Sequence, residues 1–333
     1  MIGHEDSVDS TFIGKLIGAV VAIIIVASVL TPVILEIEDE DDGKEDMYVF
    51  MITGQSNSAY RNANVSVVND EVEKIPFGSA YYIGTSERPP ASKPSDWQTQ
   101  IANWGMYSMN NPDGSWHIGN YEPELASIFY QTTGKKCLII NAGWDSASIN
   151  ACQPGEYLNT YVKAMFNKAM SLIPDVYNVK IGCIFWSQGE ADDTMTINEY
   201  KSKFIRMWND YRSTMGWDAI LMAQTKYDQS PITPTAQEQL DGIDHIYLAT
   251  KITQTFTIEN GLMGNDNQHY SQKGRILVAE DWMNYYLSNE YSESPPITNS
   301  SFKTIIGFIP ILVAVGLIIG AVSLFYDRQN YQY

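Results

Sequence analysis

Cysteine and histidine are scarce in this sequence, and their scarcity limits the classes of protein it can represent. The chain has three cysteines and four histidines among 333 residues. Three cysteines make no disulfide framework, and we expect Cys137 and Cys183, which lie in apolar runs, to be buried. Cys152 falls in a predicted loop, which leaves one unassigned disulfide bond open. No Cys/His group has metal-site spacing, so we predict no metal and no cofactor.

Positive charge is also scarce. The sequence has 21 Lys and Arg residues against 39 Asp and Glu residues, for a formal net charge of -18. Nucleic acid and anionic lipid head groups repel such a chain, and no basic stripe overrides this, so we exclude nucleic acid as a partner. Hydrophobic residues make up 44% of the chain, enough for a large core.

Two long uncharged segments stand near the ends, at residues 16–35 and 304–325. A helix of about twenty residues spans roughly the 30 Å hydrocarbon core of a bilayer, so we predict two transmembrane helices. The alternative for the first segment is a cleaved signal peptide, although no clear cleavage site follows it. The alternative for the second segment is a buried core helix. Lys15 and Arg328 flank the segments and place both termini in the cytoplasm or a virion interior.

The spans divide the chain into seven parts. These are a tail (1–15), a span (16–35), an acidic linker (36–46), an outer domain (47–290), a Ser/Pro-containing linker (291–303), a span (304–325) and a tail (326–333). The acidic linker is expected to be a solvated spacer. The predicted location is a membrane, with the outer domain on the extracellular side of a cell surface or virion envelope.

Strand-like and helix-like segments alternate in the outer domain. The predicted strands are Met47–Thr53, Lys136–Asn141, Lys180–Trp186, Ala219–Ala223 and His245–Ala249. The predicted helices are Glu122–Thr133, Tyr157–Leu172, Ile197–Thr214 and Ser271–Leu287. This alternation predicts an α/β fold whose mostly parallel sheet is covered on both faces. Ligands of such folds bind beyond the carboxyl ends of the strands.

Small and polar residues follow several of these strands. The clusters are GQSN (54–57), NAGW (141–144), SQGE (187–190) and, before the last helix, DNQH (266–269). They contain the groups that acyl transfer needs, because a serine nucleophile requires a base, and a histidine base requires a carboxylate to orient it. We therefore predict Ser56 as nucleophile, His269 as base and Asp266 as its partner.

The developing oxyanion needs hydrogen-bond donors, each worth about 3–4 kcal/mol in well-studied enzymes. The predicted donors are the backbone amides of Ser56 and Gly143 and the carboxamide of Gln188. Taken singly, each motif is weak: GQSN is typical of a plain turn, and an Asp-x-x-His sequence arises by chance. Their combination in this order at strand ends is much more specific.

GQSN, WSQGEAD (186–192) and DNQH together resemble the sialate O-acetylesterase-like, carbohydrate esterase branch of the SGNH hydrolases, over about residues 47–287. The resemblance implies a three-layer, flavodoxin-like α/β/α fold and metal-free removal of acetyl groups from carbohydrates. It also implies the triad Ser56, His269 and Asp266 and the donor role of Gln188. Glu190 would be a second partner of the histidine or a structural brace, and Gln55 and Asn57 are candidate auxiliary residues.

Two positions depart from the family pattern. Ser58 stands where the family usually has Met, and Ala142-Gly143-Trp144 replaces the usual Gly-Gly pair followed by Ser or Thr. Gly143 is thus a less secure donor than Ser56. Trp144 is a candidate substrate-lining residue that narrows the pocket or turns outward as a sugar-stacking platform. The aromatic residues Trp97, Trp104, Tyr107 and Trp116 are expected in the core, with a sugar-facing wall as the alternative.

The sequence therefore predicts a membrane-anchored carbohydrate O-acetylesterase that acts on extracellular or surface glycans. Its predicted partners are an O-acetylated glycan and the lipid bilayer, and small residues in the spans leave a homo-oligomer or coat assembly open. The rival prediction is a catalytically inactive SGNH-fold protein that binds glycans or forms part of a virion or cell coat. A lipid esterase or thioesterase is the third hypothesis.

Overall fold

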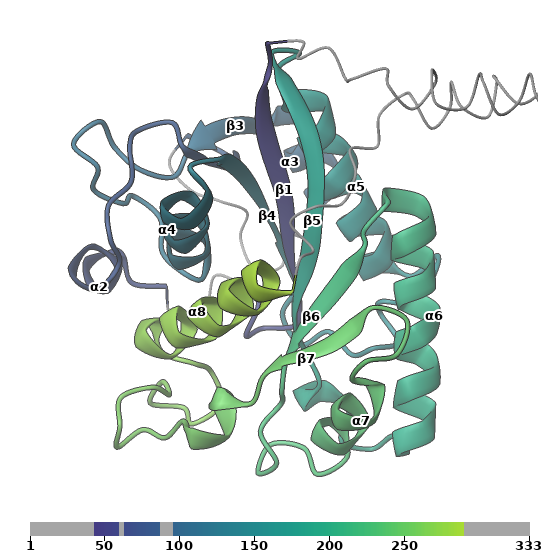
Figure 1. The fold of residues 1–333 in the computed structure, drawn as a ribbon. Coiled ribbons are helices and arrows are strands. Elements are labelled where there is room, and N and C mark those ends of the chain that lie inside the picture. The colour runs from purple at the N-terminus through teal and green to yellow at the C-terminus, as the bar shows by residue number, and fades with distance from the viewer. Residues whose placement is uncertain (1–42, 60–62, 87–95, 290–333) are drawn as a thin grey trace, which may run out of the picture. The chain divides into compact units, whose positions relative to one another are not determined.

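A computed structural model describes residues 43–59, 63–86 and 96–289, and it arranges them around one seven-stranded sheet (Figure 1). The strands are β1 (Glu45–Gly54), β2 (Ala80–Gly84), β3 (Gly105–Ser108), β4 (Lys136–Gly143), β5 (Tyr177–Ser187), β6 (Ala219–Ala223) and β7 (Ile246–Thr250). Their order is β3-β2-β4-β1-β5-β6-β7. All neighbours pair in parallel except β2 and β3, which confirms the predicted mostly parallel sheet.

Helices cover both faces of this sheet (Figure 1). One face carries α3 (Trp97–Asn103), α5 (Tyr157–Leu172), α6 (Ile197–Met215) and α7 (Thr233–Leu240). The other face carries α2 (Val65–Glu71), α4 (Glu122–Thr133) and α8 (Gln272–Ser288). Two short 3₁₀ helices, η1 (Glu190–Asp192) and η2 (Ile252–Thr255), follow β5 and β7. The three-layer α/β/α architecture implied by the family resemblance is therefore observed.

The central strand β1 shows how the sequence builds two cores. Successive side chains of a strand point to opposite faces. Met47, Val49 and Met51 pack into the core beneath α5 and α6, whereas Phe50 and Ile52 pack into the core beneath α4 and α8. Because both faces are covered, β1 reads as a nearly continuous apolar run.

Helix α6 follows directly from its sequence pattern. Thr196 caps its first turn by accepting a hydrogen bond from the Glu199 N–H (3.2 Å), and Gly216 ends it in the left-handed region, at φ 78°. The predicted apolar stripe is buried against the sheet: Tyr200, Phe204, Met207, Trp208 and Tyr211. An N-cap, a periodic stripe and a terminal glycine are the signals that define a helix in sequence.

The segment between β1 and β4 is packed as a core element. It forms β2, β3, α2 and α3, none of which we had predicted. Trp104 and Trp116 are buried, and Trp97 and Tyr107 are partly buried against the two cores. The predicted core role of these aromatic residues is confirmed. All three cysteines are also buried and free, as predicted for Cys137 and Cys183, and no disulfide bond forms.

The topology of the sheet has its switch point at β1. The five strands β4-β1-β5-β6-β7 have the flavodoxin-like order, in which the second strand lies on one side of the first and the third lies on the other. The chain therefore leaves β1 in one direction to reach β4 and returns to β5 on the opposite side. Ligands bind at such switch points, outside the carboxyl ends of the strands. The GQSN motif begins at that end of β1.

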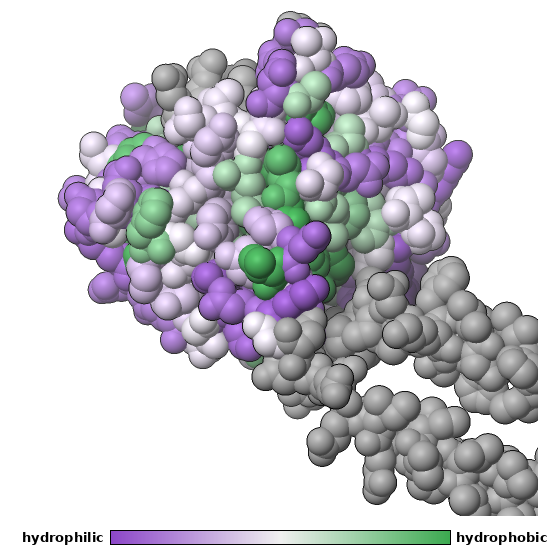
Figure 2. Space-filling model, turned by 90° about the horizontal axis from the view of Figure 1, so that it is seen from above, coloured by the Kyte–Doolittle hydropathy of each residue, from purple (hydrophilic) through white to green (hydrophobic). Residues whose placement is uncertain are grey.

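The described surface carries no large apolar face in the view from above, which shows a narrow hydrophobic strip bordered by hydrophilic side chains (Figure 2). The exposed large apolar side chains come from different parts of the chain, among them Val65, Phe77, Tyr157, Val176 and Tyr227. No helix among the described residues has the length and apolarity that crossing a membrane requires. The two predicted spans, at 16–35 and 304–325, lie outside the described residues.

Candidate active site

Ser56 lies on a tight turn at the carboxyl end of β1. Gly54 starts this turn at φ 133°, and a Cβ atom there would lie 2.1 Å from the Ser187 carbonyl oxygen. Only glycine accepts both the backbone conformation and this close approach. The Gln55 N–H donates to the same Ser187 carbonyl (3.0 Å), so the turn is joined to the end of β5. Ser56 is left 8% exposed at the switch point.

Two neighbours of Ser56 brace the turn. The Gln55 side-chain oxygen accepts hydrogen bonds from the backbone N–H groups of Gly189 (3.2 Å) and Ala191 (3.1 Å). The buried Ser58 hydroxyl lies 2.8 Å from the carbonyl oxygens of both Thr53 and Ser187 and shares its proton between them. Ser58, the departure from the family pattern, therefore tightens the junction of β1 and β5.

Asn57 joins the turn that carries Ser56 (residues 54–59, the serine turn) to the loop that carries His269 (residues 266–269, the histidine loop). Its side-chain nitrogen donates to the Gln268 carbonyl (3.3 Å), and its side-chain oxygen accepts from the Tyr270 N–H (3.0 Å). These two residues flank His269. Because these contacts lie on both sides of His269, Asn57 holds the His269 loop against the Ser56 turn.

Asp266 and His269 form the second half of the predicted triad. Asp266 Oδ2 lies 2.7 Å from His269 Nδ1, and Asp266 Oδ1 accepts from the N–H groups of Gln268 and His269 at 3.0 Å each. Burial opposes ionisation of Asp266, but these hydrogen bonds outweigh it and lower the pKa of the carboxyl to about 2. The carboxylate therefore accepts the Nδ1 proton at neutral pH and leaves Nε2 as the basic nitrogen.

The third link of the triad is open. Within the described residues, no hydrogen bond joins the Ser56 hydroxyl to the ring of His269, which is 6% exposed. Catalytic hydrogen bonds in structures without substrate are often long and tighten only in the complex. The fold brings the two side chains into adjoining turns, and the Ser56–His269 contact stays a prediction.

The predicted oxyanion donors differ in how free their protons are. The Gly143 N–H donates to Asn141 Oδ1 (3.0 Å). The Gln188 side-chain nitrogen donates to the Ala147 carbonyl (3.1 Å) and to Asp192, and its oxygen accepts from the Tyr200 hydroxyl (3.0 Å). In this structure the Gln188 carboxamide therefore braces the β5 end, and its role as an oxyanion donor stays a prediction.

The Ser56 backbone N–H is the predicted donor that has no acceptor among the described residues. Gly143 has a second function instead. A Cβ atom at that position would lie 2.6 Å from the Ala59 nitrogen and from the Ser58 carbonyl carbon. Glycine therefore allows the end of β4 to pack directly against the serine turn, which explains why a glycine is needed there.

Trp144 does not turn outward as a sugar platform. It is 6% exposed and packs against Tyr157 and Tyr161, with ring centroids 5.4 and 5.0 Å away. The wide loop after Trp144 lines a cavity of about 500 Å³ together with α6. Its walls are Ser146, Ser148, Asn150, Ala151, Gln153, Pro154, Glu156, Tyr157 and Arg206. Tyr157, which is 47% exposed, is the aromatic side chain of that cavity.

Glu190 acts on Asn57 in this structure. Its Oε1 accepts a hydrogen bond from the Asn57 side-chain nitrogen (2.7 Å). Burial raises the pKa of the Glu190 carboxyl, although the Asn57 hydrogen bond and the neighbouring His269 oppose this shift. Of the two predicted roles, the contact supports the brace, and no described hydrogen bond joins Glu190 to the histidine ring.

Sequence reasoning missed a second layer of support beneath the serine turn. The Tyr121 hydroxyl donates to the Asn57 carbonyl (2.7 Å), and Arg275 Nη1 donates to the same carbonyl and to the Ala59 carbonyl (3.1 Å). Arg275 is fully buried, with its guanidinium 5.2 Å from the centre of the Tyr121 ring. A cation on the buried side of α8 was the available signal.

Among the described residues, no group of three or more His, Cys, Asp or Glu side chains could hold a metal ion.

Comparisons with known proteins identify the family. Residues 46–288 match the family described as carbohydrate esterase, sialic acid-specific acetylesterase. A search of the curated proteins gave no match. Similar solved structures include a protein from Arabidopsis thaliana, with 13% identity and a TM-score of 0.49, covering 73% of this chain and 98% of that one.

Two further structures carry functional names. A carbohydrate acetylesterase from Xanthomonas citri has 16% identity and a TM-score of 0.48, and the match covers 74% of this chain and 57% of that one. NanS has 13% identity and a TM-score of 0.47, covering 74% of this chain and 98% of that one. The family match spans most of the present sequence. The chain belongs to this carbohydrate esterase family and is a hydrolase that acts on carboxylic esters.

Proposed function

We propose that this esterase removes O-acetyl groups from an extracellular or surface glycan through Ser56, His269 and Asp266. One observation carries the proposal: Asn57, the residue after Ser56, bonds to both neighbours of His269, which is itself paired with Asp266. This arrangement holds the His269 loop against the Ser56 turn, with an ionised carboxylate behind the imidazole, and so supports proton transfer from Ser56 to His269 during the reaction.

In the proposed reaction, His269 Nε2 accepts the Ser56 proton while Ser56 Oγ attacks the acetyl carbonyl carbon. The Ser56 N–H donates to the oxyanion that develops. The protonated imidazole then donates its proton to the sugar oxygen, which leaves as a free hydroxyl, and the acetyl group remains on Ser56. The same imidazole deprotonates water, whose attack on the acetyl-enzyme releases acetate and restores the serine.

The glycan and the membrane complete the proposal. The family supports an acetylated carbohydrate as substrate. The cavity of about 500 Å³ has the size of a small-molecule site, and Tyr157 and several hydroxyl and amide groups lie in its wall. The uncharged segments 16–35 and 304–325 support an anchor at each end of the chain, and Lys15 and Arg328 support an external catalytic domain.

The test of the chemistry uses the full chain in detergent with p-nitrophenyl acetate. We expect Ser56→Ala to lower kcat by at least about 10³-fold, since it removes the nucleophile. A fluorophosphonate probe should label Ser56, as read by peptide mass spectrometry. Ser213→Ala, which changes an exposed serine on α6, is the matched control and should keep full turnover. Equal turnover by wild type and Ser56→Ala contradicts the assignment.

The same experiment separates the alternatives. Glycan binding without probe labelling or turnover would support an inactive glycan-binding or coat protein. A preference for long acyl chains in a series of p-nitrophenyl esters would support a lipid esterase instead of an acetylesterase.

Membrane anchoring needs its own test. We expect the full chain to remain in the membrane pellet after alkaline carbonate extraction, because two apolar helices resist release. External protease should then remove the esterase domain from sealed cells. Full release by carbonate contradicts the anchor without affecting the assignment of Ser56.

A further inference from the structure

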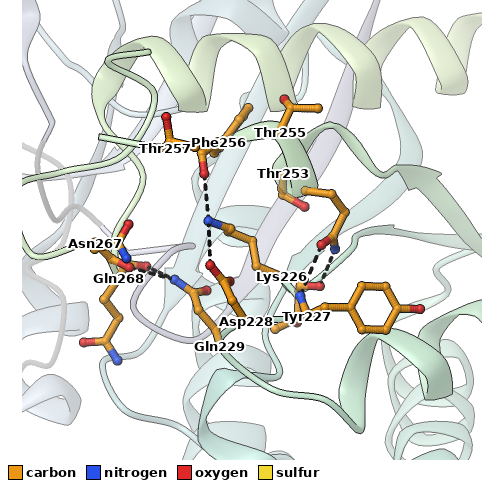
Figure 3. Close-up of polar contacts among 12 residues, drawn as sticks. Lys226, Tyr227, Asp228, Gln229, Thr253, Thr255, Phe256, Thr257, Asn267 and Gln268 are labelled. Atoms are coloured by element: carbon orange, nitrogen blue, oxygen red, sulfur yellow. Dashed lines mark hydrogen bonds and ion pairs between the residues drawn. The ribbon is translucent and has the colours of Figure 1, made fainter. Parts of the chain in front are cut away.

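The loop after β6 reaches across the carboxyl edge of the sheet to the histidine loop (Figure 3). The Gln229 side-chain nitrogen donates to the carbonyl oxygens of Asn267 (3.3 Å) and Gln268 (3.1 Å). Those two residues are the whole connection between Asp266 and His269. Gln229 thus binds the backbone that sets the distance between the acid and the base.

The Gln268 carbonyl accepts from two side-chain amides. One belongs to Asn57 on the serine turn (3.3 Å), and the other belongs to Gln229 (3.1 Å). The serine turn and the β6 loop therefore hold the same peptide group. Asn267 lies in the left-handed region, at φ 52°, which for a residue other than glycine persists only when surrounding contacts determine it.

Lys226 anchors the loop that carries Gln229. Its ammonium group donates to the Phe256 carbonyl (2.7 Å) and pairs with Asp228 (3.2 Å), and its side chain is only 7% exposed (Figure 3). The Gln229 N–H donates back to the Lys226 carbonyl (3.1 Å). The Lys226 ammonium group is buried and has fixed acceptors, so it holds the start of the short turn in place. The position of Gln229 on that turn is thereby fixed as well.

We infer that Gln229 is a positioning residue for the catalytic histidine, which it fixes through the Asn267 and Gln268 carbonyls. This inference rests on the proposed function for its effect on rate. Its structural part, the restraint of residues 266–269, does not depend on that function. The charged side chains that face the ring are Asp266 on its own loop and Glu190 on η1.

The first variant removes the two hydrogen bonds from the Gln229 side chain to the Asn267 and Gln268 carbonyls. Gln229→Ala should lower kcat by about 10- to 100-fold, because small misplacements of a catalytic group have effects of this size. KM for p-nitrophenyl acetate should stay within twofold, since the hydrogen bonds of Gln229 go to Asn267, Gln268 and Lys226 and none of them goes to the Ser56 turn. The melting temperature should change little, which separates positioning from general loss of fold.

The second variant keeps the shape of the side chain but replaces its hydrogen-bond donor with a negatively charged acceptor. Gln229→Glu loses both donated hydrogen bonds and brings negative charge toward the histidine. We expect a loss of kcat as large as for Gln229→Ala and a shift of the acid limb of the pH–rate profile to higher pH, because negative charge favours the protonated imidazole. A purely structural role would lower the rate and leave the position of that limb unchanged.

Amide hydrogen exchange on the full chain supplies a readout besides activity. The peptide covering residues 264–271 should exchange faster in Gln229→Ala than in wild type. The control is Gln239→Ala with Gln239→Glu, at an exposed α7 position whose side chain contacts only Lys201 (3.0 Å), and both should match wild type. Full kcat and unchanged exchange in Gln229→Ala overturn the inference, while Ser56→Ala still tests the proposed function. If wild type hydrolyses no ester, the proposed function fails, and the exchange result alone tests whether Gln229 restrains residues 266–269.

Discussion

The two sides of Ser56 are organised differently. On one side, Asp266 and Asn57 bind the residues of the histidine loop, and the base is paired with an ionised carboxylate. On the other side, the N–H groups of Gly143 and Gln188 donate to acceptors within the protein. The Asp266–His269 pair of the proposed site is therefore already formed, whereas on the other side the Ser56 N–H is the predicted oxyanion donor without an acceptor among the described residues.

This difference has a physical origin in burial. The Gln188 side chain is 1% exposed, and it lies beside Asp192, which is fully buried. Burial raises the pKa of the Asp192 carboxyl, although the hydrogen bonds from Gln188 and the Ile149 N–H favour its charged form. A buried carboxyl needs such donors. Gln188 therefore donates its hydrogen bond to Asp192 within the protein. The predictions below test whether the two sides of Ser56 respond differently to substitution.

The largest effect is expected on the proton-transfer side. Asp266→Asn should lower kcat by about 10³- to 10⁴-fold, because an amide favours the wrong tautomer of the histidine. Steady-state turnover of p-nitrophenyl acetate measures the change. Asp193→Asn, at an exposed aspartate near η1, is the matched control and should behave as wild type.

The pH dependence provides a second check on Asp266. Its pKa is lowered to about 2 by the hydrogen bonds it accepts. A lowered carboxyl pKa adds stability above the unfolded-state pKa, near 4, and this stability is lost as pH falls through about 2. Asp266→Asn should therefore destabilise the domain at pH 6 and have little effect near pH 2. An equal effect at both values would contradict the ionised carboxylate.

A smaller loss is expected when the link between the serine turn and the histidine loop is cut. Asn57→Ala removes the contacts with Gln268 and Tyr270 and leaves Glu190 without its hydrogen bond. We expect kcat to fall by about 10²-fold, as a catalytic group loses its position. Stability should fall by about 1–3 kcal/mol, because a buried acceptor loses its donor.

Asn57→Asp tests the contribution of the contact between residue 57 and Glu190. It places a second carboxyl group beside Glu190, and two neighbouring carboxyl groups raise the pKa of one of them. Its loss of stability should be larger at pH 7 than at pH 4, as measured by urea unfolding. A loss independent of pH would indicate that Glu190 is already protonated in the wild-type site.

The regular elements of the fold were predictable where their sequence signals are long or form an uninterrupted apolar run. Helices Glu122–Thr133 and Tyr157–Leu172 and strand Ala219–Ala223 lie where the periodicity and apolar runs placed them. The missed elements are short, such as β3 with four residues and α3 with seven. A four-residue edge strand has no pattern of its own, since its partner β2 determines its position.

The site was predictable in its residue types and less so in its contacts. Strand-end polar residues correctly indicated that the Ser56 turn and His269 meet at one edge of the sheet. The same reasoning predicted Gln188 as an oxyanion donor, and the sequence does not reveal that Asp192, four positions later, accepts a hydrogen bond from its side chain. Gln229 and Arg275 escaped notice because most of their hydrogen-bond partners are backbone carbonyls, which every residue possesses.

On the oxyanion side, Gln188→Ala should affect stability more than rate. It removes three buried hydrogen bonds, to Ala147, Asp192 and Tyr200, so unfolding free energy should fall by about 2–4 kcal/mol. We expect kcat of the folded enzyme to stay within about tenfold of wild type. A loss of 10²–10³-fold, the usual effect of removing an oxyanion donor, would show that Gln188 changes partners during the reaction.

Gln153→Ala is the matched control for this variant. Gln153 donates to the carbonyls of Ile149 (3.0 Å) and Lys203 (3.1 Å) and lies in the wall of the cavity beyond Trp144. It should lower stability with no change in turnover of p-nitrophenyl acetate. If it alters kcat as much as Gln188→Ala, the rate effect of both variants reflects the loop and not the oxyanion.

The smallest effect is expected in that cavity, beyond the oxyanion side. Tyr157 is 47% exposed and rests on Trp144, so Tyr157→Ala removes an aromatic surface that is already held in place. We expect KM for an O-acetylated oligosaccharide to rise about three- to tenfold, the equivalent of ~0.7–1.4 kcal/mol. Turnover of p-nitrophenyl acetate, which has no sugar, should stay unchanged, as should both substrates with Phe77→Ala, at a 58% exposed position. Equal effects on the two substrates would mean that Tyr157 acts through Trp144 on the serine turn, and the two sides of Ser56 would then be coupled.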